Sequence, residues 1–430
     1  MLRSFSVENY RSFKDKITFS MVPAPKQKGL DYSILHEFAD GKEYKGLSSA
    51  VIYGPNASGK SNLIGAMQLL KILIERGHIR NVAPYNIDAI FWMLELIPNN
   101  TLKEAKPVTF SITFTEEKKL FTYTLSIDLG MFLDKTYKRK IVHEQLEINK
   151  KTIFDRTFNT LSFGNLKPVA SYLSSSQKDS DVIQNIAQNS LAEDELFLTN
   201  GFKTIISTKL AGIIQNYFQV KFKPFYHADI LEYNPYTPNQ FNTVPKSLEL
   251  AVKDFGINAN KLVYIKDERD PDRSVLCSVM ENGRCIPAGD FESYGTIRFI
   301  NMFPIVAKAI QFGSTVIIDE FDSSIHPMAI MSLINIFHND EINIHHAQLI
   351  FNTHNPLYLN NNLFRRDEIK FIDRDDETKC SRHYSLSDFG TKGTNARKGK
   401  EYMNNYFMDE YGAIRDIDFT DIFEKLAKET

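Results

Sequence analysis

Residues 54–61 have the types and the spacing that phosphate binding requires, because they match the pattern G-x-x-x-x-G-K-[ST]. The glycines allow backbone N–H groups to turn toward phosphate oxygens, while Lys60 supplies a positive charge for the β- and γ-phosphates. Ser61 offers a hydroxyl to Mg²⁺, and the start of a following helix favours an anion. A chance match in a surface turn is the rarer alternative. The pattern therefore predicts an ATP and Mg²⁺ site formed by Gly54, Pro55, Asn56, Ala57, Ser58, Gly59, Lys60 and Ser61.

An acidic pair closes a second apolar segment. Residues 315–318 are apolar and lead directly into Asp319 and Glu320. A buried strand would place Asp319 at the carboxyl end of a sheet, beside the phosphate loop, where it can hold Mg²⁺ directly or through water. Glu320 points differently and can polarise a water for attack on the γ-phosphate. The plain alternative is an ordinary strand end followed by an acidic turn, which the phosphate pattern disfavours.

A histidine follows the next apolar segment. Residues 348–352 predict a strand, and the polar turn after them contains His354. Parallel strands end at one edge of a sheet, so we expect His354 to bond the γ-phosphate or the attacking water. A lone histidine is more often structural, but its position one strand after the acidic pair favours the functional role. Asp322 and Ser323 lie between the two strands and either cross to a partner's nucleotide site or cap the next helix.

A parallel sheet is needed to bring these residues together. Short apolar runs predict buried strands at residues 49–53, 314–318, 348–352 and 368–372. Helical spacing after Lys60 predicts a helix that stops at Gly77, and further helices are predicted at 296–311 and 329–337. Strands that alternate with helices indicate a parallel sheet.

The first half of the chain predicts a second, antiparallel sheet. Residues 108–114 and 121–127 alternate with period two around a charged turn, and we expect residues 141–148 and 152–156 to extend that sheet. Residues 26–45 are polar and mixed, and we expect a loop there. Helices are predicted at 182–199, 203–218 and 248–255, and a loop at 233–243. We expect three parts, with an N-terminal lobe at 1–165, a mostly helical insertion at 166–265 and a C-terminal lobe at 266–430.

Composition limits the environment of the chain. Of 430 residues, 43% are hydrophobic and 24% charged, and the net charge of −2 gives no general basic field for nucleic acid. The three cysteines form no CxxC pair, which is typical of reduced thiols. The first residues contain no apolar signal region, and no run of about 18 apolar residues is present. We therefore expect a cytoplasmic protein without a membrane segment.

These patterns together resemble ABC-type ATPases of the SMC, RecF and overcoming-lysogenization (OLD) group. Within that group, the chain resembles the compact standalone AAA-type ATPases of bacterial abortive-infection and phage-defence operons. The segments that carry the resemblance are 7–13, 54–62, 292–296, 319–327 and 353–356. The resemblance implies an α/β P-loop ABC-type head with an antiparallel β subdomain and a helical insertion. It also implies that Arg11 approaches the phosphates and that Asn62 belongs to the phosphate loop.

The segment Glu292-Ser293-Tyr294-Gly295-Thr296 resembles the signature motif of that group. Ser293 and Gly295 precede a helical stretch, so their amides can bind a phosphate, although Ser293 can also be a simple N-cap. In this group the signature binds the γ-phosphate held by the other subunit. The resemblance therefore implies a homodimer, or a higher homo-oligomer, that ATP holds together.

The chain departs from the family pattern in several places. Gln68 lies within the first helix, residues 84–88 stand where a Q-loop is expected, and no long coiled-coil arm is present. Residues 355–430 are too short for the Toprim nuclease domain of OLD-type proteins. We expect residues 373–376, with their three aspartates, to form an acidic turn rather than a metal motif.

The resemblance implies an ATP-hydrolysing switch that controls a separate effector protein, such as a Toprim-type nuclease, in anti-phage defence. One alternative is a DNA-repair or DNA-binding ATPase of RecF character. Another is a regulator that binds ATP without hydrolysis, against which Glu320 argues. A transporter subunit fits less well, because the signature lacks the LSGGQ form.

Overall fold

The computed structural model describes residues 1–428 apart from 26, 28, 81–95, 133, 135, 174–179, 227–241, 257–260, 267–273, 390–400 and 416. The residues expected to replace a Q-loop, and most of the loop predicted at 233–243, lie outside the described residues.

A six-stranded sheet forms the centre of the molecule, and its carboxyl edge carries the predicted site residues. The strand order is β11 (Phe222–Phe225), β16 (Thr315–Ile318), β17 (Gln348–Asn352), β5 (Ser49–Tyr53), β18 (Ile369–Arg374) and β19 (Ser381–Ser385). All neighbours are parallel except β18 and β19. Every residue of β5, β16 and β17 is buried, as expected for parallel strands covered on both faces. The predicted parallel sheet is confirmed.

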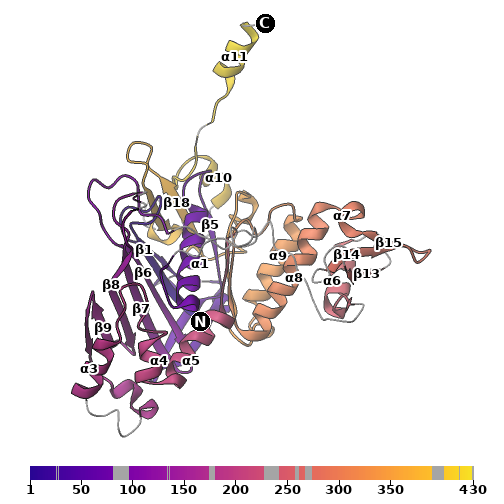
Figure 1. The fold of residues 1–430 in the computed structure, drawn as a ribbon. Coiled ribbons are helices and arrows are strands. Elements are labelled where there is room, and N and C mark those ends of the chain that lie inside the picture. The colour runs from indigo at the N-terminus through magenta and orange to yellow at the C-terminus, as the bar shows by residue number, and fades with distance from the viewer. Residues whose placement is uncertain are drawn as a thin grey trace.

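A seven-stranded antiparallel sheet packs on the other side of the first helix. Its order is β10 (Thr160–Phe163), β9 (Lys151–Thr157), β8 (Lys140–Ile148), β7 (Lys119–Asp128), β6 (Val108–Glu116), β1 (Leu2–Glu8) and β2 (Ile17–Ser20). The predicted hairpin is β6–β7. Helix α1 (Lys60–Arg76) lies between the two sheets, with its apolar residues in one core shared with both (Figure 1). Gly77 ends α1 in the left-handed conformation, as predicted.

The loop expected at 26–45 is wrong, because part of this segment forms a hairpin. Strands β3 (Ile34–Ala39) and β4 (Lys42–Leu47) pair antiparallel around Asp40 and Gly41. Both turn residues have positive φ, which is the conformation that Asp-Gly favours in two-residue hairpins. This dipeptide was the sequence signal for the hairpin.

The helix predicted at 182–199 is half wrong, because α3 (Ser180–Asn189) stops early. A buried ion pair between Arg156 and Glu144 holds the following segment in a non-helical form. The Glu144 carboxylate accepts hydrogen bonds from the backbone N–H groups of Phe197 and Leu198. Arg156 donates to the carbonyls of residues 192 and 195. These bonds replace the ones that a helix would make.

The helix predicted at 203–218 is interrupted once. Helix α4 (Gly201–Ile205) ends before Ser207, whose side chain caps α5 (Thr208–Asn216). A single π-helical turn, residues 217–221, then leads directly into β11. Because β11 is the edge strand of the central sheet, the range 166–265 includes part of the sheet as well as helices. The division into three parts stays a prediction.

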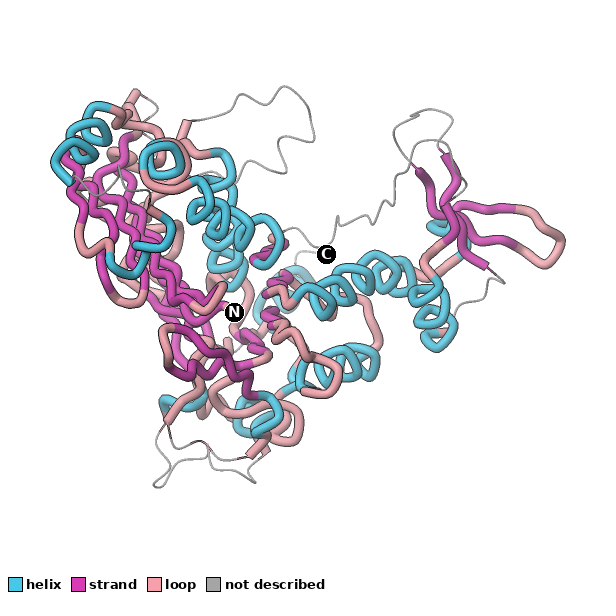
Figure 2. Tube along the Cα trace, turned by 90° about the horizontal axis from the view of Figure 1, so that it is seen from below, coloured by secondary structure: helices cyan, strands magenta, loops and turns pink. Residues whose placement is uncertain are grey.

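An arm extends from the central sheet on the side of α8 and α9. It contains α6 (Lys246–Phe255), a four-stranded sheet, α7 (Ala288–Phe291) and α8 (Tyr294–Phe312), whereas α9 (Pro327–His338) packs on β5 and β17 of the central sheet. The strands of its sheet are β12 (Asn242–Thr243), β13 (Lys261–Lys266), β14 (Ser274–Val279) and β15 (Cys285–Pro287). Figure 2 shows this sheet at the outer end of α8. The described chain ends with α10 (Tyr402–Phe407) and with α11 (Thr420–Lys428), which stands away from the body (Figure 1). Helices of the length and hydropathy needed to span a bilayer are absent from the part of the chain that the structure describes.

Candidate functional site

The loop at 54–59 joins β5 to α1 and depends on its two glycines. Gly54 and Gly59 have φ values of 156° and 109°, which other residues rarely adopt. A Cβ atom at Gly54 would overlap the carbonyl oxygen of Ile372, and one at Gly59 would come within 2.6 Å of the Ser12 hydroxyl. The backbone therefore folds tightly over the start of α1, as phosphate binding requires.

Lys60 lies inside this loop. Its Nζ donates hydrogen bonds to the carbonyl oxygens of Gly54 (2.7 Å) and Pro55 (3.0 Å). Burial lowers the pKa of Lys60 to about 8, although the nearby carboxylates of Asp319 and Glu320 act in the opposite direction. Ser58 Oγ is buried in the same loop without a hydrogen-bond partner. The loop thus holds a buried cation and a free polar group, which suit a phosphate ligand.

The acidic strand end meets the phosphate loop. Ser61 Oγ donates to Asp319 Oδ1 at 3.1 Å, so the hydroxyl and the carboxylate are direct neighbours. Burial raises the pKa of Asp319 to about 6, against the opposing effect of hydrogen bonds from Ser61 and Asn352. Mg²⁺ prefers oxygen ligands and is usually held by one or two protein groups together with substrate phosphates and waters. Ser61 and Asp319 fit this requirement.

Asn352 connects the two strand ends and was missed in the sequence. Its side-chain amide donates to Asp319 Oδ1, while its oxygen accepts from the backbone N–H of Glu320 at 2.5 Å. Glu320 has a φ of 49°, and its carbonyl accepts from the Arg298 guanidinium at 2.6 Å. Asn352 and Arg298 therefore fix the backbone of the acidic pair. The signal for Asn352 was its place at the end of the strand next to the acidic one.

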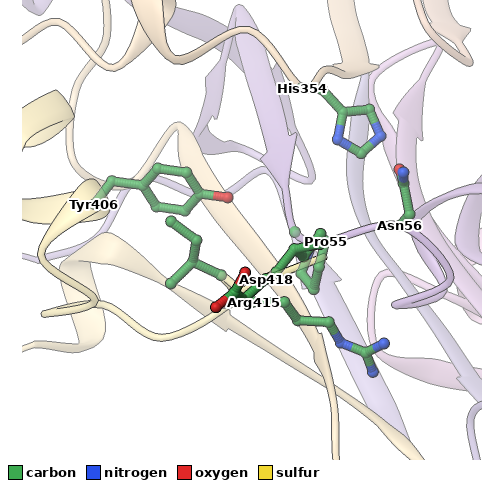
Figure 3. Close-up of a pocket in the computed structure, with 9 residues that line it drawn as sticks. Pro55, Asn56, His354, Tyr406, Arg415 and Asp418 are labelled. Carbon is green, nitrogen blue, oxygen red and sulfur yellow. The ribbon is translucent and has the colours of Figure 1, made fainter. Parts of the chain in front are cut away.

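His354 lies beside the phosphate loop, at the wall of a cavity. The cavity has a volume of about 520 Å³, and Gly54, Pro55, Asn56 and His354 form part of its wall. Figure 3 shows His354 and Asn56 beside each other at this cavity. Burial and the charge of Lys60 lower the pKa of His354, which favours the neutral imidazole at pH 7. His354 is thus placed beside the first residues of the phosphate loop.

Asn62 and Ser381 bond groups at the phosphate loop, whereas Arg11 bonds Tyr226. Asn62 Nδ2 donates to Ser12 Oγ at 2.8 Å, and Ser381 Oγ donates to the carbonyl of Ser58 at 2.5 Å. Arg11 donates to the Tyr226 hydroxyl at 3.2 Å. The expected approach of Arg11 to the phosphates stays a prediction.

The signature segment does not line this cavity. Ser293 is exposed and caps α8, with its Oγ accepting from the Thr296 N–H at 3.1 Å. The start of α8 packs on the segment after the acidic pair, because a Cβ at Gly295 would overlap the carbonyl of Ser324. At this helix start Ser293 is exposed, while Gly295 is half-buried against Ser324.

The remaining polar candidates have structural partners. Asp322 accepts from the Thr353 hydroxyl at 2.7 Å, and His326, rather than Asp322 or Ser323, caps α9. Asp373 belongs to β18 and pairs with Arg382 at 2.7 Å, so the acidic turn predicted at 373–376 begins inside a strand. Among the described residues, no group of three or more His, Cys, Asp or Glu side chains could hold a metal ion by itself.

The fold and the site together define an α/β protein with a P-loop between β5 and α1. Residues 49–360, more than two thirds of the chain, match the family described as "AAA domain, putative AbiEii toxin, Type IV TA system". The chain belongs to this AAA family. The matched residues include the phosphate loop, the acidic pair and His354.

Solved SMC head domains are similar over nearly the whole chain but at low scores. The SMC head domain from Thermotoga maritima is 13% identical, with a TM-score of 0.34, and covers 89% of this chain and 98% of its own. An Smc head from Pyrococcus furiosus, bound to the C-terminal domain of ScpA, is 10% identical, with a TM-score of 0.38, and covers 90% and 97%. No curated protein matches the chain.

Proposed function

We propose that this protein binds ATP with Mg²⁺, hydrolyses it and forms a homodimer around it. The observation that carries the proposal is the contact between Ser61 and Asp319, with Lys60 buried beside them in the phosphate loop. A hydroxyl, a carboxylate and an ammonium group at one strand edge are what a triphosphate and its cation need.

Each residue has a separate role in hydrolysis. Lys60 and the backbone N–H groups of 54–61 hold the β- and γ-phosphates, while Ser61 and Asp319 hold Mg²⁺, which neutralises phosphate charge. Glu320 orients a water and takes its proton. His354, neutral at pH 7, donates a hydrogen bond to the γ-phosphate or to that water.

The second copy completes the site. Ser293 is exposed at the start of α8, where backbone N–H groups favour an anion. One copy presents this helix start to the γ-phosphate held by the other, so ATP favours the closed dimer and hydrolysis reopens it. This is a shift between two populations, driven by contacts made in only one of them.

The dimer cycle is proposed to control a separate effector. Two observations support a role in anti-phage defence: the resemblance of the motifs to standalone defence ATPases, and a family description that names a putative toxin of a type IV system. A cytoplasmic location fits this role.

Replacement of Glu320 with Gln tests hydrolysis. The Glu320→Gln variant is expected to bind ATP normally, to lose at least about 100-fold in turnover, and to stay dimeric with ATP and Mg²⁺. Light scattering during size-exclusion chromatography and phosphate release provide the two readouts. The matched control is Glu341→Gln, an exposed carboxylate in the loop before β17. Turnover that is unchanged in Glu320→Gln would contradict the role of Glu320 as base.

A further inference from the structure

Helix α11 carries exposed apolar side chains on one face. Phe419, Ile422 and Phe423 follow helical spacing and are 58%, 54% and 67% exposed, and Ile417 just before them is 65% exposed. None of the residues of α11 is buried. The helix therefore has an apolar stripe, beside the charged residues Asp421, Glu424 and Lys425.

This stripe indicates a docking surface, because the helix is too short to be stable in water alone. Isolated helices below about 12–15 residues are marginal, and most helix stability comes from packing of the apolar face. Burial of one large apolar side chain contributes about 1.5–3 kcal/mol. A surface that covers Phe419, Ile422 and Phe423 would thus supply the apolar packing that stabilises a short helix.

The segment before α11 is held against the body of the molecule. The Tyr411 carbonyl accepts from the Tyr384 hydroxyl at 2.8 Å, and the Ala413 carbonyl accepts from the Tyr406 hydroxyl at 3.0 Å. Arg415 then pairs with Asp376 at 2.8 Å. These contacts fix the chain up to Arg415, only a few residues before the helix.

The same segment borders the nucleotide site. Ile414, Arg415, Ile417 and Asp418 line the cavity whose other wall is formed by Gly54, Pro55, Asn56 and His354. Figure 3 shows Arg415 and Asp418 beside Pro55, with Tyr406 on the opposite side. Asp418 thus lines the cavity beside the phosphate loop, and α11 begins two residues later, at Thr420.

We propose that α11 packs against a second copy of this chain in the ATP-bound dimer. The proposal rests on the proposed function, in which the second copy brings its Ser293 to this phosphate loop. A copy in that position lies over the cavity from which α11 emerges, and it presents the surroundings of Ser293 to α11. Exposed apolar side chains flank that surface: Phe291 is 38%, Tyr294 61% and Met328 65% exposed. Two apolar surfaces, one beside the phosphate loop and one beside the signature, thus face each other across the dimer.

Cysteine cross-linking between differently tagged copies tests which surface α11 contacts. Both copies carry Glu320→Gln and serine in place of Cys277, Cys285 and Cys380. One copy carries Phe423→Cys and the other Tyr294→Cys. A short bismaleimide is expected to join them only with ATP and Mg²⁺. The control partner carries Ile344→Cys, which is 63% exposed and lies before β17, at the opposite edge of the sheet. ATP-dependent dimers in which Phe423→Cys couples no better to Tyr294→Cys than to Ile344→Cys would overturn the proposal.

A second experiment separates the role of α11 from the existence of the dimer. In the Glu320→Gln background, Phe419→Asp with Phe423→Asp should weaken the dimer at least about tenfold and leave ATP binding by the dilute monomer unchanged. Asp421→Ala with Glu424→Ala, on the charged side of the helix, is the matched control and should have little effect. Sedimentation velocity over a range of concentrations measures both. A dimer insensitive to the Phe changes overturns the docking of α11 alone, whereas a chain that stays monomeric with ATP in every variant overturns the dimer as well.

Discussion

At the scale of single residues, the site combines two groups whose titration is shifted in opposite ways. Burial brings the pKa of Lys60 down to about 8 and that of Asp319 up to about 6. Lys60 is charged at pH values below its pKa, and Asp319 is charged at pH values above its pKa. Both charges are therefore present together mainly between these two values, and both are needed to bind a triphosphate with its cation.

This window predicts how ATP binding depends on pH. Affinity for ATP with Mg²⁺ should be highest between about pH 6 and 8 and fall by up to about tenfold per pH unit outside it. The acid side reflects protonation of Asp319, and the alkaline side reflects deprotonation of Lys60. Fluorescent-nucleotide titration from pH 5 to 10 measures the affinity.

Two variants separate these effects from the titration of ATP itself. Lys60→Arg should bind more weakly but lose the alkaline decrease, since arginine stays charged. The Asp319→Asn variant should lose the part of the decrease in ATP affinity at low pH that protonation of Asp319 causes. Identical profiles in all three proteins would show that neither residue controls binding.

Asn352 is the residue with the most direct influence on the acidic pair. It bonds both the Asp319 carboxylate and the Glu320 backbone. Asn352→Ala should lower turnover or Mg²⁺ affinity by about 10–100-fold, as is typical when a residue that orients a metal ligand is lost. The Mg²⁺ dependence of turnover is the measurement, and binding of ATP without Mg²⁺ should change little. Equal losses in turnover with Mg²⁺ and in ATP binding without Mg²⁺ would indicate a general structural defect instead.

The sequence indicated the residues of the candidate site more readily than the contacts that support them. Lys60, Ser61 and Asp319 were singled out from short, contiguous patterns, and the structure brings Ser61 and Asp319 into contact, whereas their binding of a nucleotide stays a prediction. Asn352 and Arg298 act on Glu320 through contacts between distant segments, and such contacts have no local pattern. The cap of α9 shows the same limit. Asp322 bonds the hydroxyl of Thr353, which comes from a distant segment, and His326 caps α9.

At the scale of elements, buried polar contacts explain why one predicted helix stopped early. The apolar runs at β5, β16 and β17 predicted strands correctly, because strands buried on both faces consist of nearly continuous apolar residues. The helix expected at 182–199 stopped early because Glu144 and Arg156 bind the backbone of residues 192–198. A helical pattern in the sequence does not reveal these two distant partners.

The pair of Glu144 and Arg156 should be important for stability. Both side chains are fully buried, with 3.5 Å between Arg156 Nη1 and Glu144 Oε2. Arg156→Met should lower the free energy of unfolding by about 3–5 kcal/mol, because the Glu144 charge would be left without its partner. Chemical denaturation measures this. Arg80→Ala, which breaks an exposed pair with Glu195, should cost no more than about 1 kcal/mol. Equal losses in the two variants would contradict the importance of the buried pair.

At the scale of the whole molecule, the phosphate loop and the signature are on separate elements of one chain. The loop begins α1 beside the Asp319 strand, while Ser293 begins α8 and does not line the cavity of the loop. That Ser293 acts on the phosphate loop of a second copy stays a prediction. The place of residues 414, 415, 417 and 418 beside the phosphate loop was not predicted, because the segment before them is held by contacts with Tyr384, Tyr406 and Asp376.

The most direct test of the account is complementation between two inactive variants. Lys60→Ala removes the phosphate contact and Ser293→Arg blocks the signature, so each protein alone should lack ATP turnover. In a mixed dimer, the intact loop of one copy meets the intact signature of the other. An equimolar mixture should therefore recover up to about a quarter of wild-type turnover. Turnover no greater than the sum of the two separate variants would show that Lys60 and Ser293 do not act together across two copies, and would contradict the account.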